Sequence, residues 1–133
     1  SDEEKAEAEA KNKANTFVVD FVKKCLGEKV ADVRISRILK SQPVCMVADG
    51  PISLEMEKYF NRRGREALGY KAQRVLELNA DSDAYKALKE AIIDDEEKAK
   101  LYTNLLYNQA LIIAGLPLED AAAFTADVCK LMK

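Results

Sequence analysis

Residues 101–132, LYTNLLYNQALIIAGLPLEDAAAFTADVCKLM, carry more apolar surface than one helix of a small domain needs. They predict two helices broken at Gly115-Leu116-Pro117, because glycine commonly ends a helix and proline cannot continue one. In the first helix the apolar residues form two stripes, one of Leu101, Leu105 and Ile112, flanked by Tyr102 and Gln109, and one of Leu106, Ala110 and Ile113. Together the stripes exceed the roughly 100° arc of a helix that buries one face.

An apolar arc of this width implies that the helix has two burial partners. One partner is the core of the chain itself. The other is either a second copy of the chain, since symmetric pairing is common among soluble proteins, or a further helix of a monomeric bundle. The pattern alone leaves both alternatives open.

The composition is typical of a single globular domain with a substantial hydrophobic core. The chain has 133 residues, of which 48% are hydrophobic and 33% are charged, with a net charge of −2. Cys25, Cys45 and Cys129 lie far apart among apolar neighbours, as is typical of reduced thiols in a cytoplasmic protein. No apolar run reaches the roughly 18 residues of a membrane span, and no leader segment is evident, so we expect no membrane partner.

The chain contains no histidine, which excludes Ser-His-Asp and Cys-His catalysis and most zinc sites. Its five glycines form neither a phosphate-binding loop nor a dinucleotide turn. We therefore expect no metal, no cofactor and no enzymatic activity in this chain. Catalysis by the carboxylates of Glu55 and Glu57 is an alternative that the spacing disfavours, because residues so close together on a helix point in different directions.

The hydrophobic periodicity predicts an α+β fold. Residues 1–15 have no large apolar side chain and predict a charged lead-in that is frayed or helical, whereas residues 17–26 form an amphipathic helix that Gly27 ends. Residues 32–36 alternate as a strand with one solvated face, residues 44–47 predict a strand buried on both faces, and residues 75–78 predict a third strand. Caps at 81–83 and at Asp94 begin two further helices.

The resulting order is helix, two strands, helix, strand and three helices. It predicts a small three-stranded mixed sheet packed with helices, over residues 16–93, and a C-terminal helical subdomain over residues 94–133.

A short helix before the third strand has an apolar face formed by Ile52, Met56, Tyr59 and Phe60. This face either packs in the core or is an exposed contact surface, for which methionine and aromatic residues are well suited. The basic segment 58–74 follows, and residues 34–74 hold nine Lys and Arg against four Asp and Glu. A monomeric nucleic-acid-binding domain that uses this segment is therefore an alternative function.

Six short motifs, in order and in register, resemble the carboxyl-terminal domain of the ninety-kilodalton heat-shock chaperones, and the bacterial members are the most similar. The motifs are GEKVADVR at 27–34, Pro43-Val44, Met56-Glu57-Lys58, Leu76-Glu77-Leu78-Asn79, Leu105-Leu106 with Gln109-Ala110-Leu111, and Gly115 with Leu118-Glu119-Asp120. The chain departs from the family where Ala80 and Ala121 replace a frequent proline, which alters helix capping rather than fold.

The resemblance implies a homodimeric, ATP-dependent chaperone of the bacterial cytoplasm. ATP and Mg²⁺ would bind in domains outside this chain, and residues 16–133 would form its dimerisation domain. The last two helices would pair with their copies as a four-helix bundle, through Tyr102, Leu105, Leu106, Gln109, Ala110, Ile112, Ile113, Phe124, Val128 and Leu131. The helix with Ile52, Met56, Tyr59 and Phe60 would contact unfolded or partly folded client proteins, and no nucleic-acid partner is implied.

Overall fold

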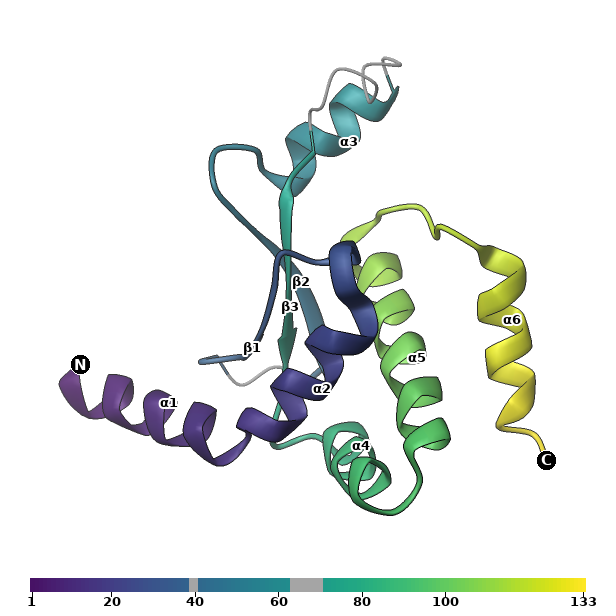
Figure 1. The fold of residues 1–133 in the computed structure, drawn as a ribbon. Helices are drawn as coiled ribbons and strands as arrows, with labels where there is room; N and C mark the ends of the chain where they lie inside the picture. The colour runs from purple at the N-terminus through teal and green to yellow at the C-terminus, as the bar shows by residue number, and fades with distance from the viewer. Residues whose placement is uncertain (39–40, 63–70) are drawn as a thin grey trace.

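A computed structural model of the chain describes residues 1–38, 41–62 and 71–133 (Figure 1). The helices are α1 (Asp2–Ala14), α2 (Thr16–Leu26), the short 3-10 helix η1 (Gly27–Lys29), α3 (Leu54–Arg62), α4 (Asp83–Asp94), α5 (Glu96–Ala114) and α6 (Ala121–Lys130). The strands are β1 (Asp32–Ile35), β2 (Val44–Asp49) and β3 (Gln73–Leu78). The predicted α+β class and the predicted order of elements are confirmed.

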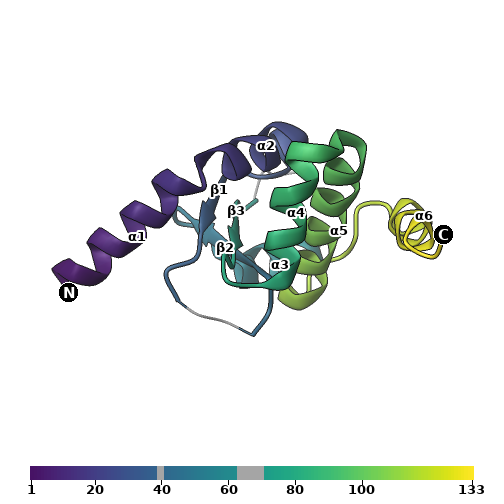
Figure 2. The ribbon, with the colours of Figure 1, turned by 90° about the horizontal axis from the view of Figure 1, so that it is seen from below.

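The three strands form a mixed sheet in the order β1-β3-β2. The central strand β3 runs parallel to β1 and antiparallel to β2, so Val33 and Met46 both lie opposite Leu76. These three side chains share one face and are buried. Helices α2, α4 and α5 cover that face and build the core with it (Figure 2).

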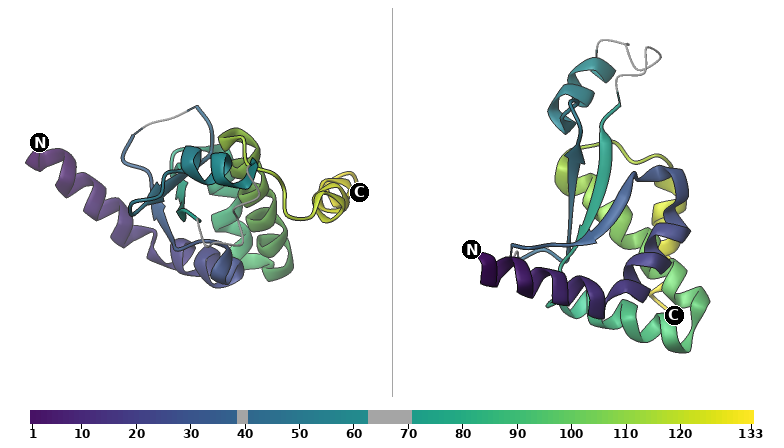
Figure 3. Two further views of the ribbon diagram at one scale, coloured as in Figure 1. Left: turned by 90° about the horizontal axis from the view of Figure 1, so that it is seen from above. Right: turned by 60° about the vertical axis from the view of Figure 1, so that its left-hand side comes forward.

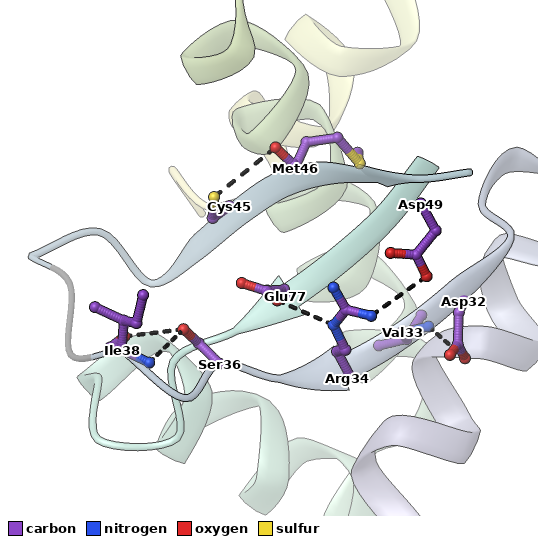
Figure 4. Close-up of polar contacts among 9 residues, drawn as sticks. All are labelled: Asp32, Val33, Arg34, Ser36, Ile38, Cys45, Met46, Asp49 and Glu77. Atoms are coloured by element: carbon purple, nitrogen blue, oxygen red, sulfur yellow. Dashed lines mark hydrogen bonds and ion pairs between the residues drawn. The ribbon is translucent and has the colours of Figure 1, made fainter. Parts of the chain in front are cut away.

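The opposite face of the sheet carries charged side chains. Arg34 on β1 donates from Nε to Glu77 on β3 at 3.0 Å, and its Nη1 lies 3.4 Å from Asp49 on β2 (Figure 4). One guanidinium thus links all three strands. The prediction that residues 44–47 are buried on both faces is wrong, because the covering helices lie on one side and Cys45 and Val47 stay half-buried on the other.

The helices begin at side-chain caps that the sequence largely predicts. Ser82 accepts a hydrogen bond from the Tyr85 backbone N–H at 3.1 Å and begins α4. The cap of α5 is Asp95, one residue later than predicted, and it accepts from the Lys98 N–H at 3.2 Å. Asp120 caps α6 in the same way.

Two glycines with positive φ end helices. Gly27 ends α2 as predicted, but with φ +55° and ψ −125° it leads the chain into η1 instead of adopting the left-handed helical conformation common after the last turn of a helix. Gly115 has φ +74° and ψ +23°, which is that conformation, and it ends α5. The next N–H, of Leu116, bonds the Leu111 carbonyl at 2.9 Å and the Leu116 side chain is buried, which completes the cap.

The remaining helices lie at the periphery of the fold. The lead-in segment is helical, and α1 projects away from the body beside β1, whereas α6 lies on the outer side of α5 (Figures 1 and 2). The right-hand view of Figure 3 shows α3 beyond the ends of β2 and β3. Helices α3 and α6, which carry residues predicted to make contacts with partners, thus lie outside the layer of helices that covers the sheet.

Candidate functional site

Helix α5 has two apolar faces with different surroundings. One face carries Thr103, Leu106, Tyr107, Ala110 and Leu111, which are buried, and four of them belong to the core cluster. The spacing of i, i+4, i+7 and i+8 from Thr103 places them on one side of the helix.

The second face of α5 looks outward. Ile112 is 52% exposed and Ile113 is 50% exposed, although both are among the most hydrophobic side chains in the protein. Leu105 is buried outside the core cluster, Tyr102 is half-buried and Gln109 is exposed. The wide apolar arc therefore divides into a face that the chain covers and a face that it leaves open.

The open face of α5 continues into an apolar groove. Residues from three helices line a cavity of about 160 Å³: Ala84 and Ala87 of α4, Tyr102, Leu105, Leu106 and Gln109 of α5, and Leu131 just after α6. Four of the ten residues predicted for the dimer interface lie on its α5 wall, and Leu131 is a fifth.

Helix α6 adds to this surface without closing it. None of its residues is buried: Phe124 and Val128 are half-buried, and Leu131 after its end is 53% exposed. Of the predicted interface residues, Leu106 and Ala110 lie in the core of the chain, and the others lie along the groove or on the open faces of α5 and α6. Helix α6 packs against α5 and leaves part of its apolar side uncovered.

The second predicted surface lies on α3. Met56 is 40% exposed and Tyr59 is 47% exposed, while Phe60 is half-buried and packs edge-on against Tyr59 with 5.7 Å between ring centroids. Ile52 precedes the helix instead of joining its apolar face, because Ser53 caps α3 by accepting from the Met56 N–H at 3.1 Å. The exposed part of the face is thus formed by Met56 and Tyr59.

The base of α3 is fixed by a buried ion pair. Glu57 is only 1% exposed and accepts from Arg74 of β3, whose Nη2 lies 3.2 Å and Nε 3.4 Å from its carboxylate. A buried carboxylate needs such a partner, because an unpaired charge away from water is strongly unfavourable. Two residues close to Glu57 in the sequence, Glu55 and Lys58, are polar and give no sign of this burial.

A third residue of this cluster, Tyr107 of α5, is also buried. Its hydroxyl donates a hydrogen bond to Glu119, and the Lys29 ammonium lies 5.6 Å from its ring centroid. Burial, with the Glu119 carboxylate beside it, raises the pKa of Tyr107 to about 12, and the charge of Arg74 acts in the lowering direction. Arg74, Glu57, Lys29 and Glu119 line a cavity of about 520 Å³ at this end of the molecule.

Catalytic or metal chemistry finds no support in the part of the chain that the structure describes. Within those residues no group of three Cys, Asp or Glu side chains is arranged to hold a metal ion. Glu55 is exposed and pairs with Lys58 at 2.7 Å, whereas Glu57 is buried against Arg74, so the two carboxylates face different surroundings. In the same residues, none of the helices is long and apolar enough to cross a membrane.

The basic segment 58–74 falls partly outside the described residues, because these omit 63–70. Of its described cations, Lys58 and Arg74 are each paired with a carboxylate. Arg74 in particular is held against a buried carboxylate, whereas the pair of Lys58 lies at the surface.

The sequence profile of the Hsp90 protein family matches residues 1–133. The chain therefore belongs to the Hsp90 family of heat-shock chaperones, and the resemblance seen in its motifs is confirmed at this level.

Proteins similar to this chain within the family include bacterial chaperone proteins HtpG. The chain is 50% identical to HtpG of Oceanobacillus iheyensis over 131 residues, which are 98% of this chain and 21% of that protein. It is 50% identical to HtpG of Alkaliphilus metalliredigens over 115 residues, 86% of this chain and 18% of that protein. It is 43% identical to HtpG of Bacillus subtilis over 132 residues, which are 99% of this chain and 21% of that protein. The chain spans about a fifth of the length of these relatives.

Proposed function

We propose that this chain is the carboxyl-terminal dimerisation domain of an Hsp90-family chaperone. The observation that carries the proposal is the open apolar face of α5, where Ile112 and Ile113 are half-exposed while the opposite face of the same helix lies in the core. Helix α6, which has no buried residue, borders that face. A second copy of α5 and α6 would complete a four-helix bundle.

Apolar burial gives the driving force for this association. Ile112, Ile113 and Leu131 each expose about half of the side chain, and covering each contributes on the order of 1 kcal/mol. In a two-fold symmetric interface every contribution is made twice, because both protomers use the same surface. The groove walled by Tyr102, Leu105 and Gln109 gives the partner's helix a place to pack.

The mechanical role of the domain would be to hold two chaperone protomers together. ATP and Mg²⁺ would bind in parts of the protein outside this chain, and this chain would hold no cofactor and carry out no chemistry. Dimerisation raises the effective concentration of the distant domains, so that their association becomes an intramolecular step. We place such a chaperone in the bacterial cytoplasm.

We further propose that α3 contacts unfolded or partly folded client proteins. Met56 and Tyr59 are exposed on a helix that stands beyond the sheet (Figure 3). A thioether and an aromatic ring suit a surface that must accept many apolar sequences, because methionine adapts its shape and aromatic rings contribute much of the contact energy. The alternative of nucleic-acid binding by segment 58–74 gains nothing from the paired cations Lys58 and Arg74.

The substitution Ile112→Asp tests the dimer proposal. The side chain is half-exposed in the single chain, so the monomer should fold, but the carboxylate would be buried without a partner in the dimer seam. We expect a folded monomer by circular dichroism and analytical ultracentrifugation. The matched control is Ile93→Asp, a change at a more exposed isoleucine on α4 outside the proposed interface, which should remain a dimer. A tight dimer of Ile112→Asp would refute the interface.

A further inference from the structure

Gln109 is a polar residue in the middle of the open apolar face of α5. It lies seven residues after Tyr102, four after Leu105 and four before Ile113, so these side chains share one face of the helix. Tyr102, Leu105 and Gln109 line the apolar groove, and Ile113, which is 50% exposed, continues the face toward the end of α5. Gln109 therefore has apolar neighbours one turn away in both directions.

The fold of a single chain does not use the side-chain amide of Gln109. The side chain is exposed, and the amide forms no hydrogen bond within the part of the chain that the structure describes. The amide of the adjacent residue differs, because Nδ2 of Asn108 donates to the Asn104 carbonyl of the same helix at 2.9 Å. Of these two neighbouring amides, one is paired within the chain and the other is open to a partner.

The Gln109 amide needs a partner once a second copy of the chain covers this face. The proposed dimer removes the face from water, and a buried amide without a hydrogen bond is unfavourable. The other side chains that line the groove are aliphatic, apart from Tyr102. The Tyr102 residue lies seven positions away, which is roughly 10 Å along the helix. The centre of the face thus offers the amide no partner except one supplied by the second copy.

Two-fold symmetry supplies that partner. In an isologous interface the two chains use the same patch, so a residue at the centre of the patch lies at the symmetry axis and meets its own copy. A glutamine amide has a carbonyl acceptor and two N–H donors, so two facing amides can each donate to the carbonyl of the other. The position of Gln109 at the centre of the open face therefore favours a reciprocal pair of hydrogen bonds.

We propose that Gln109 is a specificity-determining residue of the dimer, whose amide pairs with that of its own copy across the two-fold axis and fixes the register of the two α5 helices. This inference rests on the dimerisation proposed above and names the contact at its centre. A shift by one turn places the amide against Leu105 or Ile113 of the other copy, where it has no hydrogen-bond partner. A single buried amide sets the register of coiled-coil helices for the same reason.

Opposite charges at position 109 test this contact. Gln109→Glu and Gln109→Lys each bring like charges together in a dimer of identical chains, whereas a mixture of the two brings opposite charges together. By sedimentation velocity across a dilution series, we expect the dissociation constant of each variant alone to rise about tenfold or more. An equimolar mixture should regain the dimer. Circular dichroism checks that each variant folds, as expected for a change at an exposed side chain.

The matched controls for the charge test are Asn108→Glu and Asn108→Lys. Position 108 lies on the same helix but about 100° away around its axis. Like charges introduced there do not meet at the two-fold axis. Each control alone should therefore dimerise as tightly as the equimolar mixture of the two.

A cysteine at position 109 tests the proximity of the two copies. Cys129 is the exposed natural thiol, so the test uses a Cys129→Ser background. In that background Gln109→Cys should form a covalent dimer on oxidation by copper phenanthroline, because facing residues can bring their Cα atoms within the roughly 4.4–6.8 Å that a disulfide spans. The background protein, which keeps the half-buried Cys25 and Cys45, should stay unlinked, and Asn108→Cys should cross-link more slowly.

The outcomes separate the contact at Gln109 from the dimer itself. An unaltered chain that stays monomeric at every concentration overturns both. An unaltered dimer whose Gln109→Glu and Gln109→Lys variants each associate as tightly alone as in the mixture overturns the role of Gln109 and leaves the dimer standing. Cross-linking of Gln109→Cys that is no faster than that of Asn108→Cys, in chains that still dimerise, has the same consequence.

Discussion

The Lys58 ammonium of α3 lies 3.3 Å from the Cβ position of Gly115, the residue that ends α5. Gly115 itself has φ +74°, a conformation that other residues adopt only with strain. The turn that directs the chain toward α6 therefore depends on a glycine chiefly for its backbone conformation, because the Lys58 ammonium ends a flexible side chain that can move aside.

We predict that Gly115→Ala lowers the free energy of unfolding by about 1–2 kcal/mol, chiefly through backbone strain. The Lys58 ammonium is the end of a flexible side chain, so its displacement adds little. Gly27→Ala is the comparison without a neighbouring side chain, because nothing lies within 4 Å of its Cβ position. Its φ of +55° with ψ −125° lies outside the left-handed helical region, so this substitution should cost more than Gly115→Ala. Urea titration measures both, and an unchanged stability of Gly115→Ala would contradict the left-handed cap.

The exposed face of α3 gives a second prediction. Met56→Ser with Tyr59→Ser should weaken binding of reduced carboxymethylated α-lactalbumin about tenfold, equivalent to about 1.4 kcal/mol. The melting temperature and the dimer mass should hardly change, because both side chains are exposed. Fluorescence anisotropy measures the binding, and Ile38→Ser, at an exposed isoleucine far from α3 in sequence, should bind normally. A large drop in melting temperature would instead place Met56 and Tyr59 in a packed environment.

A substitution at Tyr85 should not lower stability, in contrast to Gly115→Ala. Its hydroxyl is buried, and no hydrogen-bond partner for it lies within residues 1–38, 41–62 and 71–133. Tyr85→Phe removes this polar group and keeps the ring, so we expect stability to be unchanged or to rise by about 1 kcal/mol. Thermal and urea unfolding test this, and a loss above about 1 kcal/mol would show that the hydroxyl is bonded.

Tyr107 makes stability depend on pH in the alkaline range. Its pKa is raised from 10.0 in the unfolded chain to about 12 in the fold, mainly by burial. Below pH 10 the phenol is protonated in both the folded and the unfolded chain, so the free energy of unfolding keeps its full contribution from Tyr107. Between pH 10 and about 12 the phenol ionises in the unfolded chain but stays protonated in the fold, which favours unfolding. Folding should therefore lose about 2 kcal/mol across this window through Tyr107.

Comparison with Tyr107→Phe isolates this contribution from that of the lysines, which titrate in the same range. The variant should be less stable by about 1 kcal/mol at pH 7, because the hydrogen bond to Glu119 is lost, and its stability should fall less steeply above pH 10. Urea titrations between pH 8 and 12 measure both quantities. Parallel pH curves for the two proteins would contradict the burial of this phenol.

Local chemistry predicts much of this fold from the sequence. Ser82 and Asp120 are side chains that cap helices, and Gly115 supplies a left-handed end, so these boundaries follow from neighbouring residues. The alternation at Val33 and Ile35 likewise indicates β1 and its buried face. The sequence predicts the cap of α5 at Asp94, one residue before the observed cap at Asp95, because the carboxylates of both adjacent aspartates can accept a hydrogen bond from the first turn of the helix.

The polar cluster could not be predicted in this way. Glu57 and Arg74 are 17 residues apart and come together only because β3 lies at the centre of the sheet and α3 stands at its end. Tyr107 and Glu119 are 12 residues apart, and their contact depends on the turn at Gly115. The burial of Glu57 follows from tertiary packing, which the polar residues around it in the sequence do not indicate.

The molar mass in solution, measured by light scattering on a sizing column across a dilution series, tests the proposed dimerisation most directly. The chain has a mass of 14.8 kDa. We predict a mass of twice that value that persists on dilution to sub-micromolar protein, together with the monomer mass for Ile112→Asp. A monomer mass for the unaltered chain at every concentration would contradict the proposal, because the open face of α5 would then have no second copy to cover it.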